Sequence, residues 1–405
     1  MRVLFILPYG IIPPDSGNKN LTFGLLKYLV PRTTCDIALL VDEHKYEPSI
    51  VESDLRKEFP GVRRVVVFKK PIGSERRWGR VRTLLHGKHP SLGSYLSTTL
   101  EQWLQSNVSR DTYDLIHFDM IHTTLYRSSI KDVPSLIVAS DAYSMAAREA
   151  AALLDSVTSR AKALFESWLL RNIESSDYPH FSMVCTVSDR DAAYLRSVSP
   201  GSNVRTIGIG VSAEYAERDI KHADSDALTF PRILLTGSLN HPVIAQGIVD
   251  FLEKSLPQIR EKFPEVGVVV LGRGPHAILK ECLYRDHSVE YLDFVEDYAA
   301  FLDQNWIYVY PQLCATGLQT KLQQAMALGL PVVTFPVSLG GLNVSNGKHC
   351  LICDNQTDLT RNVESLLRDP DLRRKIGTLA QAHIREKFSL ECIGKQMLSL
   401  YQDLI

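Results

Sequence analysis

Short apolar runs alternate with longer amphipathic stretches along the whole chain. The apolar runs are rich in valine, isoleucine and leucine, which is typical of strands buried on both faces of a parallel sheet. The strands expected in the first half are Arg2 to Leu7, Cys35 to Val41, Val62 to Phe68, Tyr113 to Phe118, Ser135 to Ala139, Phe181 to Val187 and Val204 to Ile209. Those expected in the second half are Arg232 to Leu235, Val266 to Leu271, Tyr291 to Val295, Trp306 to Tyr310, Val332 to Phe335 and the strand-like run His349 to Asp354.

This alternation of strands and helices predicts an α/β protein with parallel sheets. A chain of 405 residues is long enough for two domains, each with its own hydrophobic core. The polar segment 212–229 separates the two sets of strands and is the expected linker. The expected boundaries are residues 1–211 for a first α/β domain and residues 230–389 for a second.

The last two long strand candidates are joined by a helix that is expected to run from about Leu318 to Leu328. Thr316 fits its N-cap, and Gln319 would complete a capping box. Lys321 and Gln324 share one face and lean toward the turn that opens the helix. Free N–H groups, the positive end of the helix dipole and a lysine together suit a phosphate or diphosphate. The alternative is an ordinary buried βαβ unit with a solvent-exposed lysine.

Polar residues also follow strands of the first domain. Ser16 and Gly17 lie between the first strand and its helix, where a glycine lets the backbone approach a ligand closely. His117, Asp119 and His122 cluster where another strand ends. Open α/β sheets bind ligands at the carboxyl ends of their strands, so we expect one of these three to line a site. A structural histidine is the alternative.

Several motifs together resemble a known family. The pattern P-x(5)-G-x(3)-K-x(2)-Q-A-M-A-x-G-x-P-V-V, from Pro311 onward, is similar to the nucleotide-sugar segment of retaining glycosyltransferases of the GT-B class, family 4. Shorter similarities are Pro-x-Ser-Gly at 14–17, Thr-Gly-Ser-Leu at 236–239 and Gly-Arg-x-Pro at 272–275. The resemblance implies a GT-B fold, in which two Rossmann-like domains face each other across a cleft. It also implies that a last helix, residues 390–405, returns to the first domain.

The resemblance implies transfer of a sugar from a nucleoside diphosphate sugar, with retention of the anomeric configuration. The second domain would hold this co-substrate, the first would hold a sugar, lipid-linked or small-molecule acceptor, and no metal or other cofactor is expected. The catalytic candidates that could contact the sugar or the acceptor are His117, Asp119 and His122. The implied donor-binding residues are Ser16, Gly17, Gly237, Ser238, Arg273, Thr316, Gly317, Leu318, Lys321 and Gln324.

Two departures from the family pattern bear on activity. The glutamate that usually holds the donor ribose is Gln324 here, and a second glutamate near the transferred sugar is Thr316. A neutral amide can still bond ribose hydroxyls, so donor binding is expected to persist at reduced strength. An inactive glycosyltransferase-like partner that binds a sugar nucleotide is the competing hypothesis. A sugar-nucleotide epimerase of the same architecture is disfavoured, because the acidic residues of that class are missing.

Two motifs that could suggest a metal are interpreted otherwise. Asp224-Ser225-Asp226 is an Asp-x-Asp, but it lies in the expected linker with no strand leading into it. Cys350 and Cys353 form a CxxC in an apolar run with no second pair, so they are interpreted as structural cysteines. The seven scattered cysteines fit a reducing cytoplasm, where we expect the protein.

Charge is concentrated in one segment. The chain as a whole has a net charge of -1, which argues against a nucleic-acid partner. Residues 56–88 contain eleven basic and two acidic residues, a local charge of +9. Within them, an apolar stripe lies beside four arginines, which is typical of a helix on an anionic membrane, such as the inner membrane face, or against an anionic acceptor. A solvated basic face is the other interpretation, and it is the one that the sequence favours. The stripe is Trp78, Val81, Leu84 and Leu85, and the arginines are Arg76, Arg77, Arg80 and Arg82.

Overall fold

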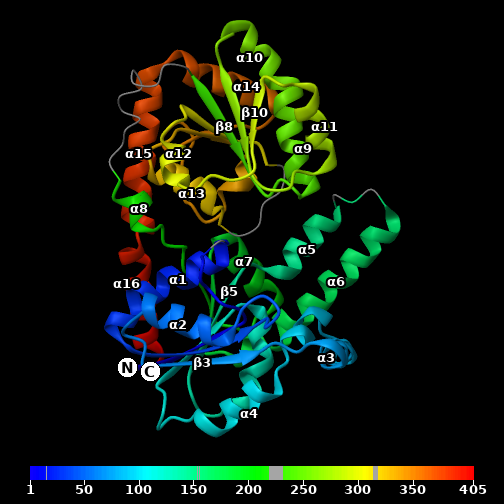
Figure 1. Cartoon of the computed structure of the whole chain (residues 1–405), viewed down its shortest axis with the longest axis vertical. Helices are drawn as coiled ribbons and strands as arrows, with labels where there is room; N and C mark the ends of the chain where they lie inside the picture. Colours follow the sequence, from blue (N-terminus) through cyan, green and yellow to red (C-terminus); the bar gives the residue numbers. More distant parts are fainter. Residues whose placement is uncertain (15, 153, 155, 219–230, 313–317) are drawn as a thin grey trace. The chain divides into compact units, whose positions relative to one another are not determined.

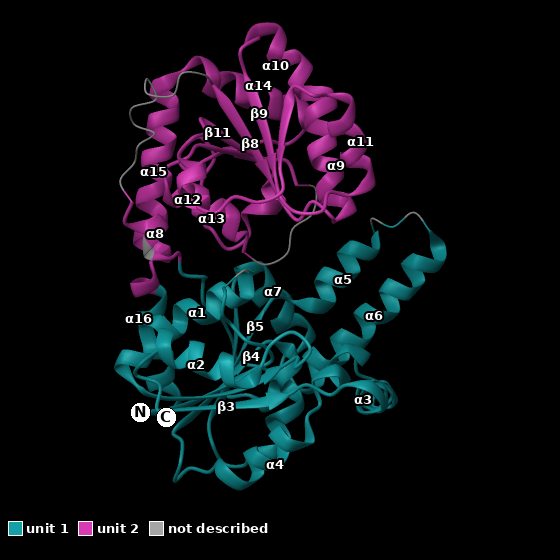
Figure 2. Ribbon diagram, in the orientation of Figure 1, with its two compact units in different colours: residues 1–210, 393–405 teal, residues 211–392 magenta. Residues whose placement is uncertain are grey.

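The computed structural model describes the chain except residues 15, 153, 155, 219–230 and 313–317 (Figure 1). The chain divides into two compact units, residues 1–210 with 393–405 and residues 211–392 (Figure 2). Each unit contains one sheet of parallel strands with helices on both faces (Figure 1). This is the predicted α/β class with two Rossmann-like units.

Unit 1 contains a seven-stranded sheet in the order β3-β2-β1-β4-β5-β6-β7. Its strands are β1 Arg2–Leu7, β2 Thr34–Val41, β3 Arg64–Lys69, β4 Leu115–Asp119, β5 Ser135–Ser140, β6 Met183–Thr186 and β7 Val204–Thr206. Its α-helices are α1 Gly17–Leu29, α2 Pro48–Glu58, α3 Gly73–Leu85, α4 Thr98–Asn107, α5 Tyr143–Ala152, α6 Val157–Ser176 and α7 Asp189–Val198. Two 3-10 helices that bear on the site are η2 Pro90–Tyr95 and η3 Ile121–Ser129.

The central strand β1 shows why this sheet forms. Val3 to Leu7 are fully buried, and β1 pairs in parallel with β2 on one side and β4 on the other. A continuous apolar strand can be covered on both faces only by helices, which the intervening amphipathic segments supply. All carboxyl ends of the strands therefore lie along one edge of the sheet, where the loops carry the polar residues.

The last helix, α16 (Leu390–Leu404), packs within unit 1 over most of its length. Ile393, Met397, Leu400 and Tyr401 are buried. Gly394 lies so close to the Tyr28 ring of α1 that a Cβ atom at this position would overlap the ring. A glycine is therefore needed for the two helices to approach each other.

Unit 2 contains a six-stranded sheet in the order β10-β9-β8-β11-β12-β13. Its strands are β8 Arg232–Thr236, β9 Gly267–Leu271, β10 Val289–Leu292, β11 Ile307–Tyr310, β12 Val332–Thr334 and β13 Leu351–Ile352. Its helices are α8 Ala213–Ala216, α9 Pro242–Asp250, α10 Leu256–Lys262, α11 Ala277–Arg285, α12 Tyr298–Leu302, α13 Thr320–Ala327, α14 Gln356–Arg368 and α15 Pro370–Phe388. A π-helical turn, Phe251–Ser255, joins α9 to α10.

Helix α13 corrects one prediction. It begins at Thr320 with Gln319 as its N-cap, so the predicted helix start at about Leu318 is two residues too early. The physical reason is that the Gln319 side chain is engaged elsewhere, because its Oε1 accepts a hydrogen bond from the Tyr310 hydroxyl at 2.8 Å. Thr316 and Gly317 themselves lie outside the described residues.

The predicted linker, residues 212–229, is partly structured. Its first residues include helix α8, which contacts α13 and α15 in unit 2. The Arg218 guanidinium also pairs with Asp303 at 2.9 Å. This end of the segment therefore packs as part of unit 2, whereas Asp224-Ser225-Asp226 lies outside the described residues.

Candidate active site

The turn after β8 is the centre of the candidate donor site in unit 2. Gly237 is buried there, and a Cβ at this position would lie 2.7 Å from Ile244 Cγ2 and 2.8 Å from Gln312 Nε2. A larger residue here would therefore displace the side chains of Ile244 and Gln312. Lys321 Nζ, from the first turn of α13, donates a hydrogen bond to the Gly237 carbonyl at 3.3 Å. The fold thus brings together two predicted donor residues that are 84 positions apart.

Lys321 has the properties of an anion ligand. Its side chain is half-buried, and burial lowers the pKa of its ammonium group. Within the described residues it forms no ion pair, so its positive charge is not neutralised by a carboxylate. An ammonium group has three donors, and the Gly237 carbonyl uses one of them. The remaining donors could hold phosphate oxygens.

Gln312 is a residue that the sequence analysis missed. It is the second residue after β11, it is 1% exposed, and its Nε2 is buried without a hydrogen-bond partner. A buried unsatisfied donor costs free energy, so it marks a place where a ligand or water is expected. Gln312 also lines a pocket of about 520 Å³ at the carboxyl edge of the second sheet. The sequence signal that could have identified Gln312 is its position as the first polar residue after a buried strand.

The loop after β9 lies beside the Gly237 turn. A Cβ on Gly272 would lie 2.9 Å from the Gly237 carbonyl oxygen, and the Tyr291 hydroxyl donates to the Gly272 carbonyl at 3.0 Å. The exposed side chain of Arg273 takes another direction, with its guanidinium 4.8 Å from the centre of the Phe294 ring. The backbone of this loop therefore joins the candidate site, whereas the Arg273 side chain does not contact Lys321 here.

The remaining predicted donor residues occupy varied positions. Ser238 is exposed, Leu318 is buried, and Gln324 is half-buried on the same helix as Lys321. In unit 1, Ser16 is the N-cap of α1 and Gly17 is its first residue. Both lie at a helix start, as the proposed backbone contact to a ligand requires.

The three catalytic candidates of unit 1 do not share one set of contacts. His117 is buried, stacks on Phe5 with ring centres 4.6 Å apart, and hydrogen-bonds through Nδ1 to the Tyr401 hydroxyl. Burial lowers the pKa of His117 to about 3, so its ring is neutral. Asp119 accepts a hydrogen bond from the Thr22 hydroxyl at 2.8 Å. In this geometry His117 and Asp119 bind the helices α16 and α1 to the sheet.

His122 lies in a different environment, at the carboxyl edge of the sheet. Its ring centre is 4.3 Å from that of Tyr95 and 6.5 Å from that of Tyr143. Its Nδ1 is buried without a hydrogen-bond partner. Burial, and then the positive charge of Lys70, lower the pKa of His122 to about 4. Of the three candidates, His122 thus has an unused polar atom that a ligand could bind.

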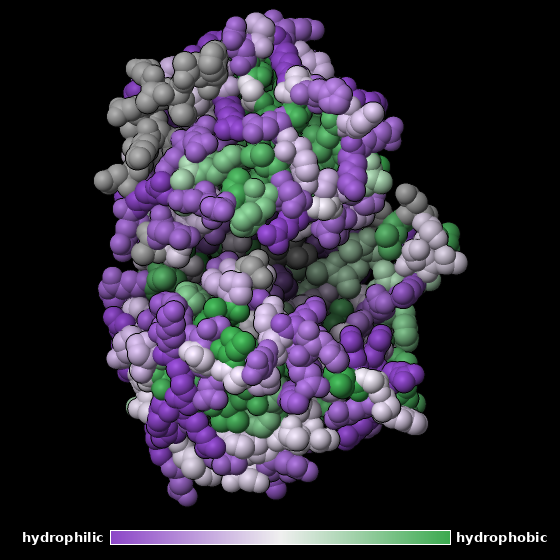
Figure 3. All heavy atoms as spheres, viewed as in Figure 1, coloured by the Kyte–Doolittle hydropathy of each residue, from purple (hydrophilic) through white to green (hydrophobic). Residues whose placement is uncertain are grey.

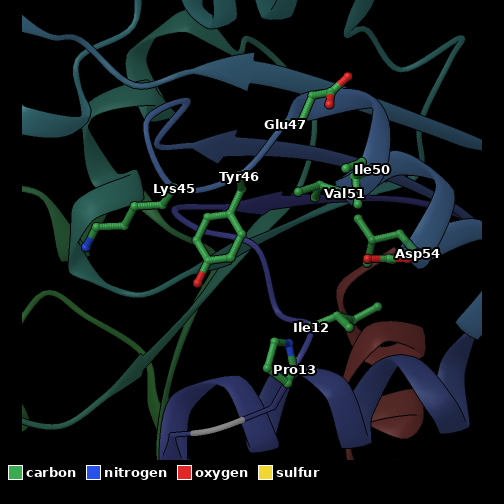
Figure 4. Close-up of a pocket in the computed structure, with 9 residues that line it drawn as sticks. Ile12, Pro13, Lys45, Tyr46, Glu47, Ile50, Val51 and Asp54 are labelled. Atoms are coloured by element: carbon green, nitrogen blue, oxygen red, sulfur yellow. The ribbon is translucent and has the colours of Figure 1, made fainter.

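A small pocket lies further along the same edge of unit 1 (Figure 4). It has a volume of about 220 Å³ and lies between the loop after β1 and helix α2. Figure 4 shows the ring of Tyr46 directed toward Ile12 and Pro13, whereas the Lys45 side chain points away from the pocket. This apolar pocket can hold a non-polar group of a ligand at the strand ends.

The buried Asp119 predicts a pH-dependent stability of unit 1. Burial raises the pKa of Asp119 to about 7, although the Thr22 hydroxyl opposes this shift. In the unfolded chain the pKa is about 3.9, so the unfolded state loses its proton first as the pH rises. The free energy of unfolding should therefore fall between pH 4 and 7. We expect Asp119→Asn to remove part of this loss, on the order of 1 kcal/mol or more at pH 8.

Urea unfolding at pH 5 and pH 8 measures this effect, and Asp111→Asn at an exposed position is the control. Asp141 and Glu174 also have pKa values raised by burial to about 7, so some pH dependence will remain. An unchanged difference between the two pH values in Asp119→Asn would contradict the prediction.

Similarity to known proteins agrees with this architecture. Residues 230–369 match the model of the family glycosyl transferases group 1. A phosphatidyl-myo-inositol mannosyltransferase of Propionibacterium freudenreichii is 27% identical over 212 residues, which are 49% of this chain and 51% of that protein. An uncharacterized 44.6 kDa protein in the cps region of Klebsiella pneumoniae is 21% identical over 163 residues, 38% of this chain and 42% of that protein. The chain thus matches about half or less of each of these relatives.

Solved structures are similar over the whole chain. HepE of Anabaena, solved with UDP-glucose, has a TM-score of 0.68 at 15% identity and covers 100% of both chains. Sucrose-phosphate synthase of Thermosynechococcus elongatus has a TM-score of 0.70 at 15% identity, covering 100% of this chain and 99% of that one. The fold is therefore that of GT-B glycosyltransferases. Fold and family match together support a glycosyltransferase.

The described residues give little support to a metal site or to a reactive thiol. Among them, no cluster of three or more histidine, cysteine or acidic side chains could hold a metal ion. Cys350 and Cys353 are buried with free thiols, and burial raises both pKa values, to about 12 and about 11. Such thiols are poor nucleophiles and metal ligands, because the thiolate is the reactive form. In the same residues, no helix is long and apolar enough to cross a membrane.

Proposed function

We propose that this protein transfers a sugar from a nucleoside diphosphate sugar to an acceptor, with retention of the anomeric configuration and without a bound metal. The contact between Lys321 and the Gly237 carbonyl carries the proposal. It places an unneutralised ammonium group at the glycine turn after β8, within the segment that matches the family model. The leaving diphosphate gains negative charge during the reaction, which a fixed cation stabilises.

Further residues of unit 2 suit the other parts of the donor. Gln324 lies one turn after Lys321 and would bond the ribose hydroxyls as a neutral substitute for a carboxylate. The orphaned Gln312 Nε2 is available for a further donor oxygen. UDP is the first nucleotide to test, because HepE was solved with UDP and UDP-glucose. The competing function, an inactive partner that binds a sugar nucleotide, is favoured by the absence of a glutamate at position 324.

Metal independence gives a direct test. We expect UDP, GDP or ADP to bind. We also expect UDP to be released from a UDP-sugar in the presence of acceptors, at the same rate with EDTA as with magnesium. The physical reason is that Lys321 and the backbone N–H groups supply the positive charge. Titration calorimetry measures binding, and a coupled assay measures release. Activity that needs a divalent ion would overturn the mechanism, and binding without release across acceptor classes would favour the inactive partner.

We also propose that α3 and α6 form a membrane-contacting surface. Trp78 and Leu85 on α3 are 73% and 81% exposed, and on α6 Phe165 stacks on Trp168 at the surface. Gly79 explains this orientation, because it packs against Gly93 and turns the apolar stripe outward. Figure 3 shows hydrophobic side chains along the α5–α6 hairpin. Exposed apolar residues beside arginines favour an anionic bilayer over a purely solvated face.

Vesicle sedimentation tests this surface. Each arginine near an anionic membrane contributes about 1 kcal/mol, so reversing Arg77, Arg80 and Arg82 to glutamate should weaken binding to phosphatidylglycerol vesicles by at least tenfold. Trp78→Ser with Leu85→Ser should weaken binding as well. Tyr284→Ser is the matched control, because Tyr284 is 78% exposed on unit 2. Equal sedimentation with neutral and anionic vesicles would leave α3 as a solvated basic face.

A further inference from the structure

The carboxyl edge of the first sheet contains a polar cluster to which neither the family match nor the proposed donor site assigns a role. Its members come from five different segments and meet where β1, β3, β4 and β5 end. All five side chains are half-buried. They are Tyr9, Lys70, Tyr95, His122 and Tyr143.

Lys70 is the cation of this cluster. It directly follows β3, and its Nζ lies 4.1 Å from the centre of the Tyr95 ring. Burial lowers the pKa of Lys70 to about 8, with Asp42 acting in the opposite direction and Lys45 and Arg76 adding to the decrease. Within the described residues, Lys70 forms no ion pair. A half-buried cation beside an aromatic face is stabilised by an anion that replaces its lost hydration.

Three orphaned polar atoms belong to the same cluster. The hydroxyls of Tyr9 and Tyr143 and the Nδ1 atom of His122 are buried without hydrogen-bond partners. Tyr95 connects them to Lys70, because its ring lies against both Lys70 and His122. Buried polar groups in folded proteins nearly always have a partner, so three orphans in one place indicate a ligand that supplies acceptors and donors. A sugar hydroxyl does both.

We propose that this cluster binds the acceptor, with Lys70 holding a phosphate group of it and His122, Tyr143 and Tyr9 bonding its hydroxyls. As an acceptor site the cluster rests on the proposed function, but as a phosphate site it does not. Arg76, on the first turn of α3, adds positive charge near Lys70 and Tyr95. The phosphate can belong to a free sugar phosphate or to a lipid-linked acceptor, and the experiment separates these sources.

Competitive acetylation of lysine, read by tandem mass spectrometry, reports on Lys70 directly. The neighbouring Lys69 pairs with Glu43 at 2.6 Å, so Lys69→Arg keeps that pair and simplifies the spectra. In this background we expect saturating glucose 6-phosphate or inorganic phosphate to slow acetylation of Lys70 at least fivefold. Methyl α-glucoside, which has no charge, should have little effect. The exposed Lys57 on α2 is the internal control.

Each outcome decides the proposal. Protection by glucose 6-phosphate supports a free phosphorylated acceptor, and protection by phosphatidylglycerol vesicles alone supports a lipid-linked one. No protection by any of these probes, or equal protection of Lys57, overturns the phosphate site. Excess UDP is present throughout, so that the donor site of unit 2 is filled.

A calorimetric titration with glucose 6-phosphate, again with excess UDP, adds a second measurement. We expect Lys70→Met to weaken binding at least tenfold and Lys69→Met to leave it unchanged. Equal affinities of the two variants would overturn the role of Lys70. If phosphate does not protect Lys70 from acetylation while UDP binds normally, this site alone is rejected. If UDP does not bind while phosphate still protects Lys70, the proposed function alone is rejected.

Discussion

Lys321→Ala should weaken binding of UDP by about 10- to 100-fold, while binding of uridine changes by about twofold or less. A hydrogen bond between charged groups is worth about 1.5–3 kcal/mol, and each 1.4 kcal/mol is a factor of ten in affinity. The effect should be confined to the diphosphate because Lys321 contacts the Gly237 carbonyl in the turn that suits phosphate oxygens. Titration calorimetry with the two ligands measures the difference between them.

Two further variants make this result specific. Lys321→Met keeps the apolar stem of the side chain, so it separates loss of charge from loss of packing. Lys280→Ala removes an exposed lysine from α11 in the same unit and should leave both affinities unchanged. If Lys321→Ala weakens UDP and uridine equally, the lysine does not hold the diphosphate. The donor site would then have to be centred on another group, such as Gln312.

The sheets could be predicted from the sequence because each strand is marked by its own local pattern. β1 is a run of consecutive apolar residues, and such a run fits few structures other than a strand covered on both faces. The glycine turn at Gly237 and the lysine at Lys321 could also be predicted, because both belong to patterns only a few residues long. Their direct contact could not, since it depends on how α13 packs beside the end of β8.

The parts that could not be predicted depend on contacts between distant residues. The start of α13 was misplaced because Gln319 bonds Tyr310, a tertiary contact that capping preferences do not include. Lys70 was hidden in a segment of eleven basic residues, and only the fold separates it from Lys69, which pairs with Glu43. His117 was selected as a strand-end histidine, yet its partner Tyr401 lies 284 positions away. Strand alternation alone does not show which buried polar group already has a partner.

That distant pair leads to the second large effect, on the stability of unit 1. Tyr401→Ala should lower the free energy of unfolding of this unit by about 3–5 kcal/mol, the usual cost of removing a buried aromatic side chain. Tyr401 is fully buried, packs edge-on against His117 with ring centres 5.9 Å apart, and bonds its Nδ1 atom. Tyr401→Phe should cost less, about 1–3 kcal/mol, because it leaves the ring in place and only removes the partner of His117.

Hydrogen exchange read by mass spectrometry can assign this loss to one unit. Peptides from β1 and β4 should lose protection by on the order of 100-fold or more in Tyr401→Ala, whereas peptides from β8 and β11 should change little. The affinity for UDP should also stay unchanged, because the candidate donor residues around Gly237 belong to unit 2. Equal loss of protection in both units would mean that α16 stabilises the chain as a whole. If the affinity for UDP fell as well, the last helix would contribute to donor binding, and the assignment of donor and acceptor to separate units would have to be revised.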